Sequence, residues 1–288
     1  MTRTALWKRG LMKAWHAATP RFGIVAGARR LRITPAPQAA GIFDWVPDWK
    51  TALIGEILGK RGGLFIDVGA NIGQTLLDYC AAPRREGYVG FEPNARCVDH
   101  LASIIRSNAL TDCVVVPAAL SSRDGLVKFY SNPDVGVDAA ATLIGDIRPS
   151  LALTSEIVAA YRFDSVRDEI VAGRGIGLVK IDVEGAELHT LLGMRETLAA
   201  ARPWLLCEVL NRDGFAEEAA HAQRMRGIMT LLGELDYAVF RIVKSVDRKR
   251  VRGYARIAAF PEIIYAPENA ESCDYLFLPD DEADALAG

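Results

Sequence analysis

The 288-residue chain has few of the residues that build disulfide frameworks or metal sites. Its five cysteines are odd in number, scattered and without a Cys-x-x-Cys pair, and its four histidines show no metal-ligand spacing. Scattered cysteines favour a reducing compartment over a disulfide framework. We therefore expect a cytoplasmic protein without a histidine- or cysteine-bound metal.

Long apolar runs and a dominant charge are also missing. No run approaches the roughly 20 residues needed to cross a bilayer, and the apolar residues 22–28 are barely long enough for the core of a signal peptide. The 34 Lys and Arg nearly balance the 36 Asp and Glu, so the net charge of −2 gives no general attraction to nucleic acid. Half of the residues are apolar, which predicts a globular protein with a sizeable core.

The N-terminal part of the chain is basic: residues 1–43 hold eight Lys and Arg and no Asp or Glu. Within it, residues 1–20 can form a helix with Trp7, Leu11 and Trp15 along one stripe. We interpret this helix as a cap on the domain, and the alternative is a weak contact with an anionic membrane surface that would make the protein peripheral. Two prolines favour a linker over residues 29–38.

Residues 63–73 read GLFIDVGANIG, an apolar run followed by a glycine-rich turn. A strand, such a turn and a helix open the nucleotide-binding unit of α/β sheets. Gly69 and Gly73 would let the backbone approach a ligand closely, and Asn71 is among the few other residues that tolerate a positive φ. On its own, the pattern also fits an ordinary tight turn between a strand and a helix.

Two further stretches favour a ligand site. Residues 88–94 read YVGFEPN, and Glu92 follows Gly73 by 19 residues, near the spacing of about 20 at which an acid binds ribose hydroxyls. Residues 177–187 read GLVKIDVEGAE, a third apolar run that ends in an acidic turn and enters a helix. The first turn does not fit the G-x-G-x-x-G pattern, which disfavours a nicotinamide enzyme.

Together, the segments DVGANIG, GFEPN and VKIDVEGAE resemble the FkbM family of S-adenosylmethionine-dependent methyltransferases. The resemblance covers residues 64–279, and its last segment is the most specific. It implies a class I methyltransferase-like, Rossmann-like α/β fold, in which helices cover both faces of a mostly parallel seven-stranded sheet and the seventh strand is antiparallel. The apolar runs that would form this sheet are residues 64–68, 88–92, 113–116, 177–182, 204–209, 237–243 and 275–278.

The domain organisation follows from this resemblance. Residues 1–43 would be a basic extension and linker, and residues 44–288 the methyltransferase domain. Its cofactor-binding core would begin at about residue 62, and an acceptor-side insertion would cover about residues 121–170. Two short strands are expected in the insertion, separated by a loop at residues 131–150 whose length indicates a functional or mobile segment.

Several helices are expected beside these strands, and one of them lies over residues 217–235. Another lies over residues 45–58 and precedes the first strand of the sheet. A third lies over residues 166–172, with Asp164 and Ser165 as caps. A fourth follows the acidic turn over residues 187–200.

The resemblance also implies S-adenosylmethionine as the cofactor and assigns residues to it. The turn from Asp67 to Gly73 would hold the methionine part, Glu92 would accept hydrogen bonds from the ribose hydroxyls, and Ala118 and Ala119 would lie by the adenine. The residues expected to bind the cofactor are Asp67, Gly69, Asn71, Gly73, Glu92 and Ala119.

Lys180, Asp182 and Glu184 alternate along one predicted strand, so we expect them to project to the same side. A lysine in a central strand is costly unless it is paired, so a structural pair of Lys180 with a carboxylate is one interpretation. In the other, Asp182 or Glu184 lies beside the methyl group and accepts a proton from the acceptor. Lys180 would serve as the base if its pKa fell, and Glu208 would face the same pocket from the next strand.

The resemblance implies O-methylation of a hydroxyl on a sugar, a glycan or a secondary metabolite. A non-catalytic cofactor-binding protein of the same fold is the first alternative. A nucleic-acid methyltransferase is the second, but we expect no nucleic-acid partner because only the N-terminal segment is basic. Asp182 and Glu208, with Asn211 nearby, are too few for an oxygen-ligand site, so we predict no required metal.

Overall fold

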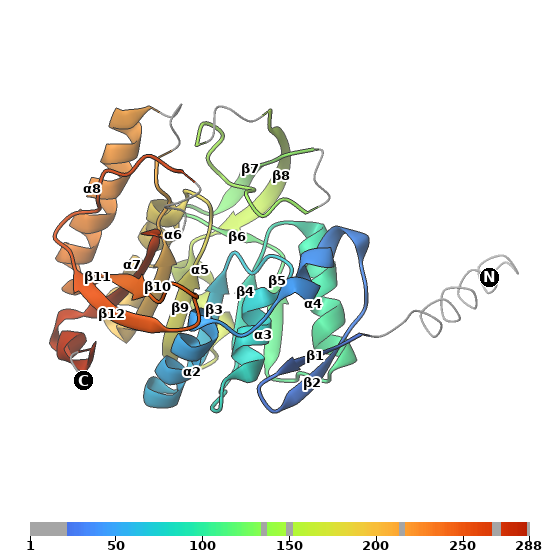
Figure 1. Cartoon of the computed structure of the whole chain (residues 1–288). Coiled ribbons are helices and arrows are strands. Elements are labelled where there is room, and N and C mark those ends of the chain that lie inside the picture. The colour runs from blue at the N-terminus through green and yellow to red at the C-terminus, as the bar shows by residue number, and fades with distance from the viewer. Residues whose placement is uncertain (1–21, 134–136, 148–151, 213–216, 267–271, 287–288) are drawn as a thin grey trace, which may run out of the picture.

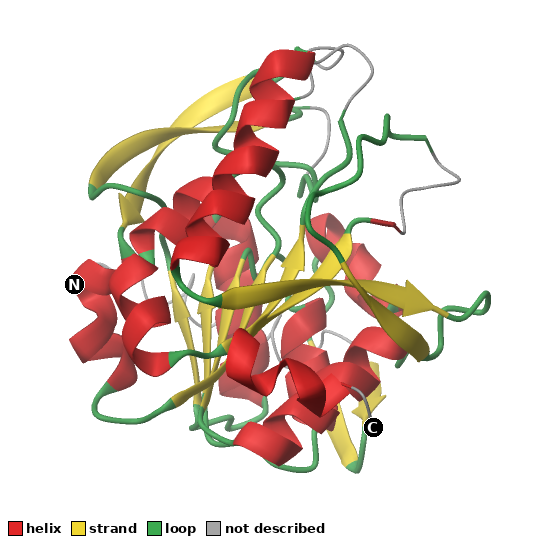
Figure 2. Cartoon of the chain, turned by 90° about the vertical axis from the view of Figure 1, so that its left-hand side faces the viewer, coloured by secondary structure: helices red, strands yellow, loops and turns green. Residues whose placement is uncertain are grey.

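The computed structural model describes residues 22–133, 137–147, 152–212, 217–266 and 272–286. At its centre lies one mixed sheet of eight strands with helices on both faces (Figures 1 and 2). The expected amphipathic segment, residues 1–20, lies outside the described residues. Within the described ranges, no helix combines the length and the apolar character needed to cross a bilayer.

The order of the strands confirms the predicted fold class. Strands β5, β4, β3, β9 and β10 run parallel, whereas β13 is antiparallel to both of its neighbours, as expected for the seventh strand. An eighth strand, β12, was not predicted, because as an edge strand it is only half-buried and its apolar signal is weak. From edge to edge the order is β12 (Val251–Arg256), β11 (Tyr237–Lys244), β13 (Asp274–Pro279), β10 (Trp204–Glu208), β9 (Ile176–Ile181), β3 (Leu64–Val68), β4 (Tyr88–Phe91) and β5 (Cys113–Val116).

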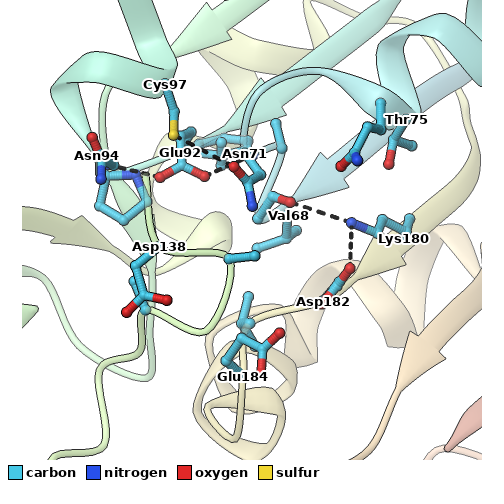
Figure 3. A pocket seen from close by; sticks show the side chains of 18 of the residues that line it. Val68, Asn71, Thr75, Glu92, Asn94, Cys97, Asp138, Lys180, Asp182 and Glu184 are labelled. Atoms are coloured by element: carbon cyan, nitrogen blue, oxygen red, sulfur yellow. Dashed lines mark hydrogen bonds and ion pairs between the residues drawn. The ribbon is translucent and has the colours of Figure 1, made fainter. Parts of the chain in front are cut away.

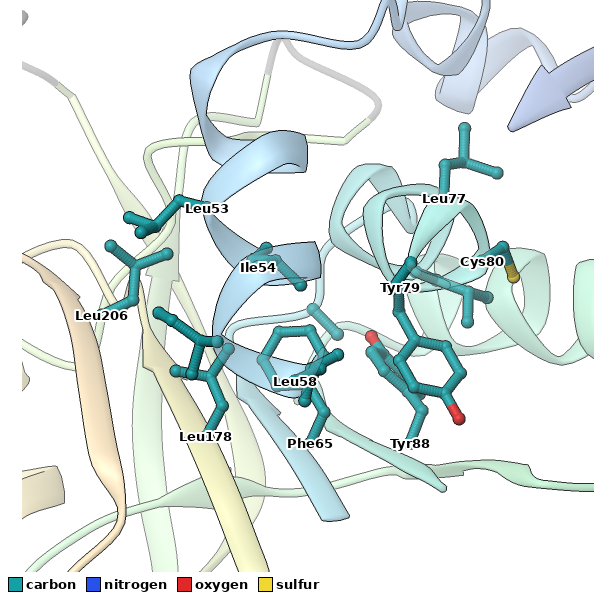
Figure 4. Packing of buried hydrophobic residues seen from close by; sticks show 14 of the residues in the cluster. Leu53, Ile54, Leu58, Phe65, Leu77, Tyr79, Cys80, Tyr88, Leu178 and Leu206 are labelled. Carbon is teal, nitrogen blue, oxygen red and sulfur yellow. The ribbon is translucent and has the colours of Figure 1, made fainter. Parts of the chain in front are cut away.

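The two faces of the sheet carry separate hydrophobic cores because successive side chains of a strand point to opposite faces. On one face, Leu53, Ile54 and Leu58 of the helix before β3 pack with Phe65 and other sheet residues (Figure 4). The helices of this face are α2 (Trp49–Arg61), α3 (Gln74–Ala81) and α4 (Ala95–Ser107). The helices of the other face are α5 (Phe163–Val171), α6 (Glu187–Gly193), α7 (Arg195–Ala201) and α8 (Glu218–Glu234).

The interpretation of residues 29–38 as a linker is wrong for its first half. Strand β2 (Arg29–Ile33) pairs with β1 (Phe22–Ala26) in an antiparallel hairpin, and η1 (Pro37–Asp44) follows. Leu31 and Ile33 are buried in the core, and the Asn108 side chain hydrogen-bonds both the N–H and the carbonyl of Arg32. Alternating arginines and apolar residues therefore form a half-buried strand here. The boundary at residue 43 stays a prediction.

The first helix begins later than predicted, at Trp49. The reason is a capping box: the Asp48 carboxylate accepts hydrogen bonds from the backbone N–H groups of Lys50 and Thr51, and the Thr51 hydroxyl accepts one from the backbone N–H of Asp48. Such a reciprocal cap is a strong signal for a helix start. It places Lys50 in the first turn, at the edge of the site described below.

The helix expected over residues 187–200 is broken into α6 and α7. A Cβ at Gly193 would lie 2.0 Å from the carbonyl oxygen of Ser121, so the chain passes too closely there for any other residue. Asp164, expected to cap its own helix, instead accepts hydrogen bonds from the N–H groups of Glu196 and Thr197 at the start of α7. Helix α5 begins one residue before Asp164. The cap is thus supplied by a residue that is distant in sequence.

The region predicted as an insertion forms a small second sheet beside the carboxyl ends of the main strands (Figure 1). It contains β6 (Ala119–Leu120), β7 (Gly125–Ser131) and β8 (Thr154–Tyr161), and the latter two confirm the short strands predicted here. The connection between them folds back, since Thr142 bridges to Tyr130 and its hydroxyl donates to the carbonyl of Glu184 at 2.7 Å. This contact brings the connection to the end of β9.

Candidate functional site

A cavity of about 520 Å³ lies at the carboxyl ends of β3, β4 and β9 (Figure 3). Its lining comes from segments spread along the chain, from η1 to the β11–β12 turn. Seven carboxylates and three basic side chains line it, so its electrostatic potential favours a cationic ligand. These charged residues are Asp44, Asp48, Asp78, Glu92, Asp138, Asp182, Glu184, Lys50, Lys180 and Arg248.

The glycine-rich turn has the backbone geometry that its sequence predicted. Gly69, Asn71 and Gly73 adopt φ values of +80°, +47° and +100°. At Gly69 a Cβ would lie 1.9 Å from the carbonyl oxygen of Asp182, so glycine is required for the ends of β3 and β9 to meet. Gly69 and Asn71 line the cavity, whereas Gly73 is the N-cap of α3. The turn thus exposes backbone to the cavity and starts a helix at its edge.

Glu92 lies at the end of β4 and its side chain is buried at the cavity wall. One carboxylate oxygen accepts a hydrogen bond from the N–H of Asn71 at 2.8 Å, and the other accepts one from the N–H of Asn94 at 2.7 Å. Burial raises the pKa of Glu92 to about 7, although these two hydrogen bonds oppose the shift. Glu92 is therefore held rigidly, with lone pairs left for hydroxyl donors.

Asp67 is not among the described residues that line the cavity. Its carboxylate is fully buried, accepts a hydrogen bond from the Tyr88 hydroxyl at 2.6 Å and lies 3.3 Å from the Lys180 ammonium. Its position supports the strands around the site, and a direct contact of Asp67 with the cofactor stays a prediction. Ala119, by contrast, lines the cavity beside Leu120.

Lys180, at the end of β9, is buried and holds three oxygen atoms. Its ammonium lies 3.1 Å from the Asp182 carboxylate (Figure 3). It also lies 3.3 Å from the carboxylate of Asp67 and donates to the carbonyl of Gly69 at 3.2 Å. Burial by itself would lower the pKa of Lys180, but Asp182 and Asp67 outweigh it and raise this pKa. The idea of Lys180 as a base with a lowered pKa is therefore wrong.

Asp182 and Glu184 both line the cavity, but they do not continue one strand. Strand β9 ends at Ile181, and Glu184 lies in the following turn with a φ of +54°. The expected alternation therefore holds for Lys180 and Asp182 alone. Figure 3 shows Asp182 directed at Lys180 and Glu184 on a separate turn.

Asp182 also lines a second, much smaller cavity. It is lined in part by Glu208 of β10, Asp274 and Lys50. Two effects raise the pKa of Glu208 to about 9: burial is the larger, and the negative charge of Asp182 is the next. Glu208 is therefore protonated near neutral pH. Burial opposes ionisation of Asp182 as well, but the neighbouring Lys180 lowers its pKa. Asp182 is thus the ionised member of the pair, and Glu208 faces the smaller cavity instead of the larger one.

The described residues contain no group of three or more His, Cys, Asp or Glu side chains that could hold a metal ion. Asn211, which was weighed as a third ligand, donates its amide to the Ser272 hydroxyl at 3.1 Å. The prediction that no metal is required stays a prediction.

Sequence reasoning missed one end of the cavity, where α2 and α3 meet. Asp78 of α3 is buried, and it accepts hydrogen bonds from the Thr51 hydroxyl at 2.6 Å and the Trp45 indole N–H at 2.9 Å. Burial raises its pKa to about 6. The sequence signal that could have indicated Asp78 as a site residue is a carboxylate among the apolar residues of a short helix. Nothing in the sequence indicated Lys50.

A family model described as the Methyltransferase FkbM domain matches residues 67–239. No curated protein matches the chain at a significant level. Among solved structures, methyltransferase FkbM from Methylobacillus flagellatus KT is 14% identical with a TM-score of 0.43, and the match covers 84% of this chain and 58% of that one. This chain therefore spans little more than half the length of that protein.

Two other similar structures are matched over most of both chains. A putative O-methyltransferase from Klebsiella pneumoniae is 10% identical, with coverage of 86% and 92% and a TM-score of 0.45. The O-methyltransferase from Bacillus cereus in complex with SAH is 10% identical, with coverage of 85% and 91% and a TM-score of 0.43. Identities this low carry no information about a substrate.

Proposed function

The chain belongs to the FkbM methyltransferase family, and from that membership we propose that it transfers the methyl group of S-adenosylmethionine to a hydroxyl oxygen of a sugar, a glycan or a secondary metabolite. The observation that carries the proposal is that the glycine-rich turn, Glu92 and Asp182 line one cavity. The turn and Glu92 supply what an adenosyl ligand needs, and Asp182 supplies an ionised carboxylate at the same place.

The residues of the cavity fit this cofactor. When bound, S-adenosylmethionine supplies a methyl group on a positively charged sulfur. The excess of carboxylates in the lining is complementary to that charge. Glu92 would accept hydrogen bonds from the ribose hydroxyls, the backbone of Gly69 and Asn71 would contact the methionine part, and Ala119 would lie by the adenine.

For the transfer step, we assign the general base to Asp182 and keep Glu184 as the alternative. Asp182 lines the cavity and is ionised, so it can hold the proton of an acceptor hydroxyl. Lys180 stays charged, and it orients Asp182 through the contact at 3.1 Å.

The acceptor side of the cavity is proposed to come from the insertion at about residues 121–170. Phe129, Asp138 and Thr142 of this region line the same cavity as the glycine-rich turn. Thr142 is anchored by its hydrogen bond to the carbonyl of Glu184, which ties the insertion to the end of β9. Contacts from this region would therefore select the hydroxyl-bearing acceptor.

The activity can be tested by incubating the protein with S-adenosylmethionine and a panel of sugars, nucleotide sugars and glycans. We expect S-adenosylhomocysteine and a methylated product, detected together by mass spectrometry, with at least one hydroxyl acceptor. Tight cofactor binding without product for any acceptor would instead indicate a non-catalytic binding protein. Product formed on nucleic acid, with binding that weakens steeply as salt increases, would overturn the assignment of the acceptor.

The pH dependence of cofactor binding tests the role of Glu92. Ribose hydroxyls can donate to the ionised carboxylate, and the pKa of Glu92 is about 7 because the group is buried. We therefore expect the affinity for S-adenosylhomocysteine to fall about tenfold for each pH unit below the pKa and to become constant above it. Isothermal titration calorimetry from mildly acidic to mildly basic pH measures this dependence.

Glu92→Gln is the matched control because glutamine keeps the size and one acceptor oxygen but cannot ionise. We expect it to weaken binding by about 10- to 100-fold at neutral pH and to remove the part of the pH dependence that is centred near pH 7. Asp78 has a pKa of about 6 and also lines the cavity. A pH dependence that stays centred near pH 7 in Glu92→Gln would therefore contradict the role of Glu92, whereas one centred near pH 6 would come from Asp78.

A further inference from the structure

Lys50 is a half-buried lysine at the first turn of α2 that lines both the large and the small cavity. Across the described ranges, no carboxylate lies close enough to its ammonium to form an ion pair. Its ammonium lies 5.9 Å from the centroid of the Trp49 ring. Lys50 thus presents a positive charge whose three hydrogen-bond donors are available to a ligand.

The other two basic side chains of the cavity are placed differently. Lys180 already holds Asp67, Asp182 and the carbonyl of Gly69. Arg248 lies in the exposed turn after β11, on the solvent side. A carboxylate that enters the cavity therefore meets Lys50 as a half-buried cation with donors available.

Lys50 lines the smaller cavity together with Lys180 and Asp182. Its neighbour Thr51 donates to Asp78 at 2.6 Å, which joins the start of α2 to α3. In Figure 3, Thr75 of α3 lies with Lys180 and Asp182 on one side, and Glu92 lies on the other. A cofactor whose ribose is at Glu92 would therefore extend its amino-acid end toward α2 and α3.

This end of the cavity combines one positive and one negative group. Asp78 is a buried carboxylate in the lining, and Lys50 is the cation beside it. A positive and a negative side chain that lie side by side in a partly dehydrated part of the cavity are complementary to a zwitterion, such as an α-amino acid group. A neutral or singly charged ligand would leave at least one of the two charged groups without an oppositely charged group on the ligand.

We propose that Lys50 binds the α-carboxylate of the cofactor's methionine part, with Asp78 accepting its α-ammonium group. The inference rests on the proposed use of S-adenosylmethionine. It adds to the cofactor site a residue that lies outside the segments DVGANIG, GFEPN and VKIDVEGAE. Lys50 remains charged, because burial and Lys180 lower its pKa but Asp182, Asp274 and Asp78 together raise it. Lys50 would thus make the site selective for ligands that carry an intact amino-acid group.

Two ligands that share the adenosine and the sulfur but differ in the amino-acid chain give a direct test. S-adenosylhomocysteine carries the amino-acid end, whereas 5′-methylthioadenosine keeps the adenosine and the thioether without it. In Lys50→Met we expect the affinity for S-adenosylhomocysteine to fall by about 10- to 100-fold, the usual worth of a charge-assisted hydrogen bond. The affinity for 5′-methylthioadenosine should remain within about twofold of the wild-type value, because that ligand never contacts Lys50.

Two control variants make the result specific. Lys60→Met changes an exposed lysine of the same helix, paired with Glu56, and should alter neither affinity. Glu92→Gln removes a partner that both ligands share and should weaken both. Melting temperatures of all variants confirm that each is folded.

Each outcome decides the inference. If Lys50→Met weakens the binding of both ligands equally, Lys50 supports the shape of the pocket but does not bind the carboxylate. If the affinity for both ligands is unchanged, Lys50 is not part of the site. If the wild-type protein binds neither ligand, the cofactor assignment fails and the role of Lys50 fails with it. Only a selective loss for S-adenosylhomocysteine supports the inference.

Discussion

Asp182→Asn is expected to lower turnover by about 10²- to 10⁴-fold, the range typical of general base catalysis, while the affinity for the cofactor changes by no more than a few-fold. Asparagine keeps the size and one acceptor oxygen of Asp182 but cannot take a proton. The effect should appear in turnover because Asp182 lines the cavity as an ionised group. The measurement is steady-state kinetics with the acceptor identified by the panel, together with cofactor titration.

The same preparation must be checked for stability, because Asp182 also pairs with Lys180 at 3.1 Å. After the substitution Lys180 still holds Asp67 at 3.3 Å and the carbonyl of Gly69, so the variant should fold. Glu184→Gln is the comparison, since Glu184 lines the same cavity from the following turn. A stable and fully active Asp182→Asn protein, beside an inactive Glu184→Gln protein, would move the base to Glu184.

Lys180→Met should reduce the free energy of unfolding by about 3–5 kcal/mol, the cost of removing one partner of a buried ion pair. Methionine fills a similar volume, so the loss comes from the carboxylates of Asp67 and Asp182, which would lose their common cation. The Asp67 side chain is fully buried and is therefore the one that cannot recover solvation. Urea unfolding followed by circular dichroism measures the change.

The double variant Lys180→Met/Asp67→Asn identifies the cause. Asparagine can still accept the hydrogen bond from the Tyr88 hydroxyl, now 2.6 Å from Asp67, but it carries no charge. Much of the lost stability should therefore return in the double variant. If the double variant is less stable than Lys180→Met, the loss arises from packing and not from a stranded charge. Lys60→Met, which breaks an exposed pair, should cost less than about 1 kcal/mol.

The strands and the turns at their ends were readable in the sequence because they depend on local patterns. A run such as residues 64–68 is apolar at nearly every position, which predicts a strand buried on both faces. Glycine at positions 69 and 73 predicts a positive φ, and both residues have one. Since parallel strands end at one edge of a sheet, the sequence alone predicts that Glu92, Lys180 and Asp182 lie close together.

Other features depended on contacts between distant segments. No local pattern shows that Asp67 faces Tyr88 and Lys180 and not the cavity, or that Asp164 caps α7 instead of its own helix. The direction of the pKa shift of Lys180 was equally hidden, because burial and neighbouring carboxylates act with opposite sign and only their distances decide between them.

Hydrophobic periodicity and glycine positions therefore specify which elements form and where they end, because those preferences act within a few residues. Which polar side chains share a cavity is a matter of long-range packing. Lys50 and Asp78 meet at the cavity because α2 and α3 pack side by side on one face of the sheet. That packing brings Lys50 to the same cavity as Glu92, although the two residues are far apart in the chain and neither α2 nor its capping box contains a binding motif.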